Sequence, residues 1–243
     1  MRFWTLNNFL IFNIKRNGEK ILQHTLSIIE NALWPILEAG FTVTIPLALI
    51  SFALSLVLAV LTAVMRISKS RLLKGLAWFY VWVFRGTPLL IQLFIVFFGL
   101  PKLNITLDAW TAAILTFALN SGAYSAESIR GAILSIPRGQ WEAADSLGMT
   151  HGQVLKRIIF PQTVRIALPA VMNDFISLVK STSLASSITI IEMTMVGQQF
   201  ASVTYEPLIL YMEVAVIYLL ISTVLTWIQG KLEIRTSKYL KKA

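Results

Sequence analysis

The sequence has 243 residues, of which 56% are hydrophobic and only 14% are charged, and its mean hydropathy is +0.70. Soluble globular domains carry about 25% charged residues, so this composition excludes an ordinary soluble domain and indicates an integral membrane protein with several spans. The chain contains no cysteine, which excludes disulfides, thiolate catalysis and cysteine-ligated metals. Its two histidines, His24 and His151, do not have the spacing of a metal-ligand pair.

The formal net charge of +9 is gathered in short segments beside apolar blocks. A nucleic-acid-binding surface would instead interleave basic and aromatic residues, and the sequence has no such pattern, so nucleic acid is excluded as a partner. Basic clusters of this kind mark the cytoplasmic ends of membrane spans under the positive-inside rule. The residues that set the predicted orientation are Arg66, Lys69, Arg71, Lys74, Arg138, Lys156, Arg157, Lys231, Arg235, Lys238, Lys241 and Lys242.

The N-terminal segment, residues 1–30, is interrupted by charges before it reaches the roughly 20 apolar residues that a span requires. Ile21, Thr25, Ile29 and Leu33 recur at helical spacing with charged residues between them. We therefore expect an amphipathic helix lying at the membrane interface.

Five apolar blocks follow, and they predict an all-α transmembrane domain over residues 31–230 with a basic cytoplasmic tail over 231–243. The expected spans are Ala39–Met65, Gly75–Leu100, Ala109–Ile129, roughly Ile166–Leu184 and Leu208–Gln229. With the basic segments inside, five spans place the N-terminus outside and the C-terminus in the cytoplasm.

The second predicted span is interrupted by Arg85-Gly86-Thr87-Pro88. An arginine that faces lipid is costly, so Arg85 is expected to snorkel or to face the bundle interior, where carbonyls or a carboxylate can receive it. Gly86 and Pro88 predict a break or bend that frees backbone carbonyls for this purpose.

A polar island, Gln140–Pro161, lies between the third and fourth spans. Gln140–Leu147 is predicted to be a short helix that ends at Gly148 in the left-handed conformation. Thr150 followed by Gln153 fits a capping box, which starts a second helix. Two helices joined by a glycine elbow, within residues 138–161, would present a rigid peg at the cytoplasmic side.

Sequence motifs for catalysis are absent: there is no Gly-x-Ser-x-Gly, no His-Glu-x-x-His and no metal cluster. There is also no Gly-x4-Gly-Lys-Ser/Thr, so this chain cannot hold ATP phosphates in a P-loop. We expect a non-catalytic membrane subunit without a cofactor of its own. If transport is driven by nucleotide, ATP and magnesium must be bound by another polypeptide.

The polar island resembles the EAA motif of ABC importer permeases. Glu142-Ala143-Ala144, Gly148 and Ile158-x-Phe160-Pro161 keep the family spacing, with Phe160 in place of the family's leucine. The resemblance implies a type I importer permease whose two short coupling helices dock on a cytoplasmic ATPase. The residues expected at this docking site are Trp141, Glu142, Ala143, Ala144, Leu147, Gly148 and Pro161.

Further segments resemble the polar amino acid branch of these permeases, in the same order and spacing. They are Phe84–Gln92, Ala123–Glu127, Ser135–Gln140 and Lys180–Leu184. The resemblance implies a bacterial cytoplasmic-membrane importer that works by alternating access. Its expected partners are two ABC ATPase subunits, a second permease chain, identical or paralogous, and an extracellular or periplasmic solute-binding protein. The expected substrate is a polar amino acid or a derivative such as cystine, histidine, arginine or glutamine.

Polar and ionisable residues within the spans are candidates for the substrate pathway, because such residues are costly in a membrane. They are Arg85, Asn120, Tyr124, Glu127, Asn173, Asp174, Lys180 and Ser181. An equally weighted alternative is that they pair with one another, for instance Asp174 with Lys180 or Arg85 with Glu127, and only hold helices together.

Other functions remain open from the sequence. An ion-coupled secondary transporter would use Asp174 or Glu127 as its coupling carboxylate and need no ATPase. An ABC importer permease for a substrate other than an amino acid, or a membrane anchor that transports nothing, would also fit the composition.

Overall fold

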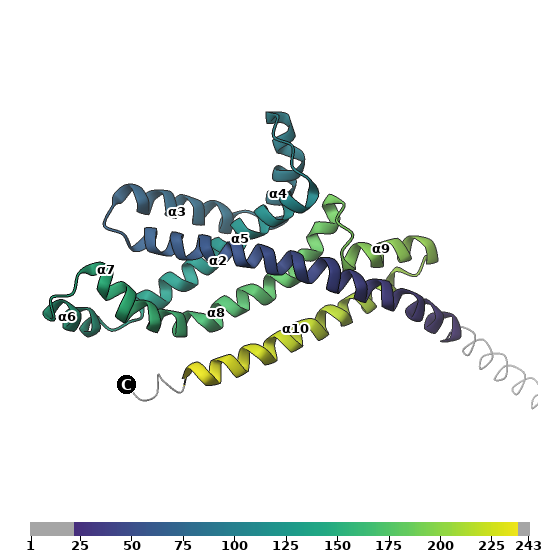
Figure 1. Ribbon diagram of the computed structural model, residues 1–243. Helices are drawn as coiled ribbons and strands as arrows, with labels where there is room; N and C mark the ends of the chain where they lie inside the picture. Colours follow the sequence, from purple (N-terminus) through teal and green to yellow (C-terminus); the bar gives the residue numbers. More distant parts are fainter. Residues whose placement is uncertain (1–21, 238–243) are drawn as a thin grey trace, which may run out of the picture.

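The computed structural model describes residues 22–237, and all regular structure within that range is helical (Figure 1). The predictions for residues 1–21 and 238–243 lie outside the described residues. The elements are the helical residues 22–39, η1 (Gly40–Thr44), α2 (Ile45–Ile67), α3 (Arg71–Gly86), α4 (Leu89–Phe94), η2 (Ile95–Gly99), η3 (Leu100–Leu103), α5 (Ala109–Leu134), α6 (Arg138–Ser146), α7 (His151–Val154), η4 (Leu155–Ile159), α8 (Phe160–Ser181), η5 (Thr182–Ile188), α9 (Met193–Thr204) and α10 (Pro207–Ser237). Of the short elements, η1, η2 and η4 are π-helical turns and η3 and η5 are 3-10 turns.

The first described helix runs without interruption from Leu22 to Ile67, through the π-helical turn η1. Its 46 residues extend about 69 Å at 1.5 Å per residue, which is about twice the thickness of the hydrocarbon core. The described part of the predicted interfacial helix is therefore continuous with the first predicted span, and the boundary expected near residue 30 lies within one helix.

Helices α2 and α5 form the centre of the bundle and approach closely through small residues. Ala59, Ala63 and Ala126 are buried between them. At Gly122 an added Cβ would lie 3.2 Å from the Ser55 carbonyl oxygen of α2. Small residues at helix interfaces let backbones approach closely, which is how membrane helices gain packing energy in the absence of a hydrophobic driving force.

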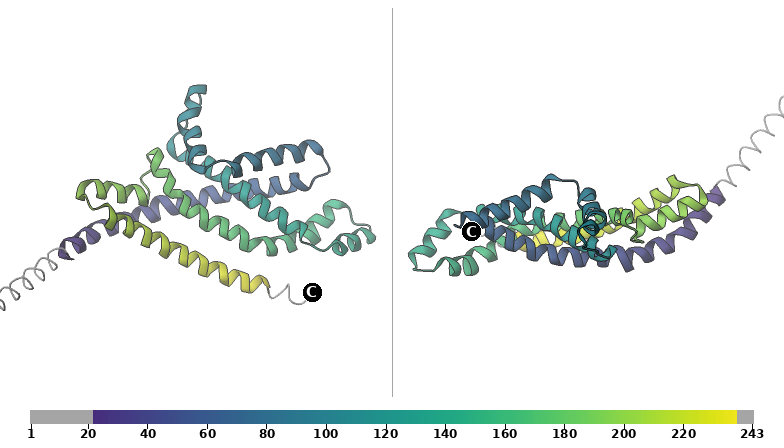
Figure 2. Two further views of the ribbon diagram at one scale, coloured as in Figure 1. Left: turned by 180° about the vertical axis from the view of Figure 1, so that it is seen from behind. Right: turned by 90° about the horizontal axis from the view of Figure 1, so that it is seen from above.

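The predicted interruption after α3 is confirmed, and it is larger than a bend. The helical segment Leu89–Leu103 is turned by 106° from Arg71–Gly86. Because Pro88 has no backbone N–H and disfavours a helical conformation at Thr87, the helix cannot continue through this point. The span expected over Gly75–Leu100 is therefore divided into two helical parts, and beyond Pro88 the chain projects sideways from the bundle as an arm (Figures 1 and 2).

The two ends of the bundle differ in what they carry (Figures 1 and 2). The α2–α3 connection, the α6–α7 elbow and the C-terminal end of α10 lie together at one end. The start of the first helix and α9 lie toward the other. Within the described residues, the basic segments that set the predicted orientation are thus gathered at one end of the molecule, as a membrane orientation requires.

The all-helical membrane fold that the sequence predicts is confirmed, whereas the count of five spans is not confirmed by length and hydropathy. Within the described range, Leu22–Ile67 and Pro207–Arg235 are each long and apolar enough to cross a membrane. The bent pairs Arg71–Gly86 with Leu89–Leu103 and His151–Ile188 with Met193–Thr204 would raise the number to four. Helix α5 has the length of a span, with 26 residues, but carries polar side chains along it.

The close contact at Gly122 yields a prediction about stability. Gly122→Ala would place a Cβ 2.9 Å from the Tyr80 hydroxyl oxygen and 3.2 Å from the Leu58 Cβ, and such overpacking costs about 1–3 kcal/mol. Gly131→Ala, in the same helix, meets nothing within 4 Å and should stabilise by up to about 1 kcal/mol through helix propensity. The melting temperature in detergent should fall for Gly122→Ala and not for Gly131→Ala. Equal melting temperatures of the two variants would contradict the close α2–α5 contact.

Candidate functional site

The elbow between α6 and α7 has the local structure that the sequence predicts. Gly148 adopts a φ of +72°, a left-handed conformation that side chains with a Cβ rarely accept. The Thr150 hydroxyl accepts from the Gln153 amide, and the Gln153 side chain accepts from the Thr150 amide, which completes the capping box. The chain therefore reverses within a few residues and starts a new helix at once.

The elbow is fixed to the spans by a buried apolar cluster. Ala144 of α6, Val154 of α7 and Ile159 at the start of α8 are each about 1% exposed. They share this cluster with residues of α2, α5 and α8, including Ala63, Ile133 and Ala167. The peg is consequently part of the bundle rather than a loose loop, and it packs against the three helices α2, α5 and α8.

The predicted docking residues fall into two groups by exposure. Leu147 is 79% exposed, and Glu142 and Ala143 are exposed beside it. Ala144 is buried within the chain, and the half-buried Trp141 stacks on His151 with ring centroids 5.9 Å apart. Gly148 forms the turn, and Pro161, although exposed, begins α8. Leu147, Glu142 and Ala143 are thus the ones available to a partner, whereas Trp141 and Ala144 shape the elbow from within.

A polar cavity of about 360 Å³ lies between α4, α5 and α8. Its wall includes the α3–α4 break and polar side chains of α5 and α8. The lining residues are Thr87, Pro88, Leu89, Asn120, Ser121, Tyr124, Asp174, Ser177, Leu178 and Ser181. Four of the residues predicted for the substrate pathway, Asn120, Tyr124, Asp174 and Ser181, are therefore brought together.

The cavity holds a negative charge with a positive charge nearby. Asp174 accepts hydrogen bonds from the hydroxyls of Ser125 at 2.8 Å and Ser128 at 3.4 Å. The guanidinium carbon of Arg85 lies 5.0 Å from the centre of the Tyr124 ring, a cation–π contact. Arg85 is close enough to Asp174 for an electrostatic interaction, while its side chain remains exposed. This arrangement offers complementary charges to a zwitterion.

Glu127, also predicted for the substrate pathway, lies in an ion cluster instead. Its carboxylate pairs with Arg66 of α2 at 3.1 Å and with Arg130 of α5 at 2.7 Å. The alternative pairing of Glu127 with Arg85 is therefore wrong, because two other arginines occupy the carboxylate. The cluster ties α2 to α5 near the elbow end of the bundle.

Asn173 and Lys180 are exposed on α8 and do not line the polar cavity. Lys180 borders a separate groove that also includes Tyr211 and Tyr218 of α10. Asp174 accepts its hydrogen bonds from serine hydroxyls of α5, and the ion pairs of the described residues do not include the alternative pairing of Asp174 with Lys180.

The buried polar residues that were not predicted from the sequence include Glu192, Glu213 and Gln92. Glu192 is fully buried at the start of α9, where it accepts from the Thr194 and Met195 amides and from the Tyr218 hydroxyl. An acidic residue directly before a helix start was the available signal. Glu213 in α10 is buried without a hydrogen-bond partner, and Gln92 of α4 is 7% exposed. No sequence pattern distinguished Glu213, whereas Gln92 is the last residue of the family-like segment Phe84–Gln92.

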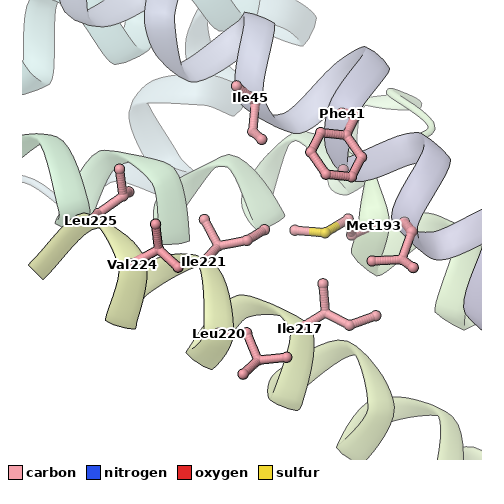
Figure 3. Close-up of a pocket in the computed structure, with 10 residues that line it drawn as sticks. Phe41, Ile45, Met193, Ile217, Leu220, Ile221, Val224 and Leu225 are labelled. Carbon is pink, nitrogen blue, oxygen red and sulfur yellow. The ribbon is translucent and has the colours of Figure 1, made fainter. Parts of the chain in front are cut away.

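A second cavity, of about 420 Å³, is lined by apolar side chains and a glycine (Figure 3). Phe41 and Ile45 of the first helix, Met193 of α9, and Ile217 and Ile221 of α10 surround it. It offers no polar group to orient a charged solute, so the polar cavity is the better candidate for a solute site.

Fold and site together define a multi-pass helical membrane protein with a rigid peg at its basic end and a charged cavity inside. The family model described as "Binding-protein-dependent transport system inner membrane component" matches residues 55–238, more than half of the chain. The chain belongs to this family.

Relatives and solved structures agree with that assignment. The chain is 44% identical over 216 residues to the L-cystine transport system permease protein TcyB of Bacillus subtilis (strain 168), covering 88% of this chain and 92% of the relative. It is 41% identical over 209 residues to the nopaline transport system permease protein NocM of Agrobacterium fabrum, covering 82% and 86%. A solved structure described as "Crystal structure of an amino acid ABC transporter with histidines" has a TM-score of 0.80 at 33% identity, covering 86% and 97%. An inward-facing structure of the MetNI methionine ABC transporter, with a TM-score of 0.65 at 20% identity and coverage of 86% and 96%, shares the fold.

The ion cluster gives a test of its structural role. Glu127→Gln would leave Arg66 and Arg130 facing each other without a counter-charge, and loss of a charge-assisted hydrogen bond costs about 1.5–3 kcal/mol. We expect a lower melting temperature in detergent, whereas Glu38→Gln, at an exposed position, should leave it unchanged. A stable Glu127→Gln protein would show that the cluster does not hold α2 to α5.

Proposed function

We propose that this chain is the permease subunit of an ATP-driven importer for an amino acid, with L-cystine as the first candidate. The observation that carries the proposal is the elbow: a glycine-turned peg, packed against α2, α5 and α8, that exposes Leu147 at the basic end of the bundle. The cystine substrate is supported by the 44% identity to TcyB over most of both chains.

The elbow is proposed to dock on a cytoplasmic ABC ATPase. The basic segments gathered at this end support its cytoplasmic placement, with the C-terminus inside and the N-terminus outside. Leu147, Glu142 and Ala143 would contact the ATPase, while Ala144 and Gly148 keep the peg in shape. ATP and magnesium would be bound by the ATPase. A second permease chain would complete the pathway, and a solute-binding protein would deliver substrate at the opposite end.

Coupling follows from how the elbow is packed. The apolar cluster around Ala144 includes residues of α2, α5 and α8. Helices α5 and α8 also carry Asn120, Tyr124 and Asp174 of the polar cavity. A movement of the elbow, caused by closure of the ATPases, would therefore shift the same helices that surround the cavity. This is the physical basis of alternating access in the proposal.

The polar cavity is proposed to bind the zwitterionic part of the substrate during its passage. Asp174 would receive the ammonium group, and Arg85 would receive the carboxylate. The cavity volume of about 360 Å³ lies within the usual range for small-molecule sites. The serine hydroxyls on Asp174 keep the carboxylate oriented before substrate arrives.

The first test concerns the elbow. Gly148→Val would impose a left-handed conformation on a β-branched residue at a cost of roughly 1–3 kcal/mol, although nothing within 4 Å obstructs a Cβ there. We expect this variant to insert normally but to lose co-purification with the ATPase. Gly148→Asn is the matched control, because asparagine tolerates this conformation. Equal ATPase recovery from both variants would contradict docking at the elbow.

The second test concerns the cavity. Asp174→Asn would replace a charge-assisted hydrogen bond to the substrate ammonium with a neutral one, and we expect the KM for L-cystine uptake to rise about ten- to hundredfold. Glu30→Gln, at an exposed position of the first helix, should leave the KM unchanged. Uptake would be measured in proteoliposomes that contain the ATPase and the binding protein. An unchanged KM in Asp174→Asn would remove this carboxylate from the substrate pathway.

A further inference from the structure

The corner between α3 and α4 leaves a backbone carbonyl without its usual donor. In a continuous α-helix the Phe84 carbonyl would accept from the N–H of residue 88. Residue 88 is a proline, which has no N–H. An unsatisfied backbone group at membrane depth costs several kcal/mol, so another donor is needed at this corner.

Gln92 supplies that donor. Its side-chain nitrogen lies 2.9 Å from the Phe84 carbonyl, 3.1 Å from the Thr87 carbonyl and 2.8 Å from the Thr87 hydroxyl. The Thr87 hydroxyl in turn donates to the Val83 carbonyl at 2.8 Å. The Gln92 side chain is buried, so these contacts are protected from competition by water or lipid headgroups.

Asn120 closes the network from α5. Its side-chain nitrogen donates to the Phe84 carbonyl at 3.1 Å and to the Gln92 side-chain oxygen at 3.0 Å. The end of α3, the start of α4 and the middle of α5 are therefore joined through two amide side chains. Both groups of the Gln92 amide are used, which fixes the orientation of the side chain as well as its position.

The corner held in this way is one wall of the polar cavity. Thr87, Pro88 and Leu89 line the cavity, whereas Gln92 does not. Arg85, two residues before Thr87, lies over the Tyr124 ring. Gln92 and Asn120 thus hold the Phe84 carbonyl, which lies next to Arg85 at the end of α3. The direction of the corner decides where the wall formed by Thr87, Pro88 and Leu89 stands relative to Asp174.

We propose that Gln92 is a positioning residue for the polar cavity. It donates to the Phe84 carbonyl in place of the N–H that Pro88 lacks, and it joins the 106° corner to α5 through Asn120. It thereby holds in place both the end of α3 that carries Arg85 and the cavity wall formed by Thr87, Pro88 and Leu89. Its role in substrate affinity rests on the proposed function of the cavity, whereas its role in fixing the corner does not.

The corner itself can be tested without transport. Because the sequence has no cysteine, spin labels can be attached to Leu76→Cys on α3 and Leu103→Cys at the end of the arm, which are 54% and 69% exposed. The distance between the labels is measured by pulsed electron paramagnetic resonance, with one labelled chain per complex. We expect a narrow distribution with Gln92 and a broadened or shifted one with Gln92→Met, which keeps the side-chain length without the amide.

Gln198→Met, which changes an exposed glutamine of α9, is the matched control and should keep the narrow distribution. Gln92→Glu is a second variant that retains the acceptor for Asn120 and removes the donor, and it should also broaden the distribution. If both Gln92 variants give the narrow distribution of the control, Gln92 does not hold the corner and the proposal is overturned.

Uptake kinetics test the consequence for the cavity. Gln92→Met is expected to raise the KM for L-cystine at least about tenfold, because Arg85 and the cavity wall are no longer held in place. A loss of folded protein alone would lower the maximal rate and leave the KM unchanged. If the unmodified protein is active and Gln92→Met has the same KM, the positioning role is overturned. An inactive parent protein would instead refute the proposed function and leave the distance measurement as the test of the corner.

Discussion

A chain that crosses a bilayer must satisfy its backbone hydrogen bonds internally, and this constraint governs the whole structure. Long helices meet it directly, and the interruptions at the α3–α4 corner, at the elbow and before α9 have side-chain hydrogen-bond partners. At the α3–α4 corner, Gln92 and Asn120 supply donors that Pro88 cannot. At the elbow, the capping box of Thr150 and Gln153 starts the next helix. The side chain of Glu192 caps α9 in the same way.

The interruptions are also the places where the proposed functional sites lie. The elbow lies at the basic end, and the corner forms one wall of the polar cavity. Between them, α2, α5 and α8 pack through alanine and other small residues, which lets the backbones approach closely. Close packing of this kind transmits displacement rather than absorbing it. One compact set of helices therefore connects the proposed ATPase site with the proposed substrate site.

Features fixed by neighbouring residues could be predicted from the sequence. The left-handed Gly148, the capping box and the break at Arg85–Pro88 are decided by glycine, proline and side chains within one helical turn. The 106° direction of the corner could not be predicted, because it depends on Asn120, which lies 28 residues beyond Gln92. The hydrophobic pattern also predicted an interfacial helix within residues 1–30 and a separate span over Ala39–Met65, although the described residues from Leu22 to Ile67 form one helix.

The candidate sites show the same limit. Residue type identified Asn120, Tyr124 and Asp174 as costly polar groups within spans, and the structure brings them into one cavity. Glu127, by contrast, pairs with Arg66 of another helix, α2, and the sequence alone did not indicate this pairing. In the nine-residue helix α6, packing against α7 and η4 decides that Ala144 faces inward, whereas Leu147, directly after the helix, is exposed. Such choices depend on tertiary contacts that one sequence does not reveal.

The most direct test of the account is the energy source for uptake. Proteoliposomes containing this permease, its ATPase and its binding protein should accumulate L-cystine when ATP is supplied to the ATPase side. Omission of either the ATPase or ATP should abolish accumulation, even when proton and sodium gradients are imposed. Accumulation driven by an ion gradient without ATPase or ATP would contradict the account and identify an ion-coupled transporter.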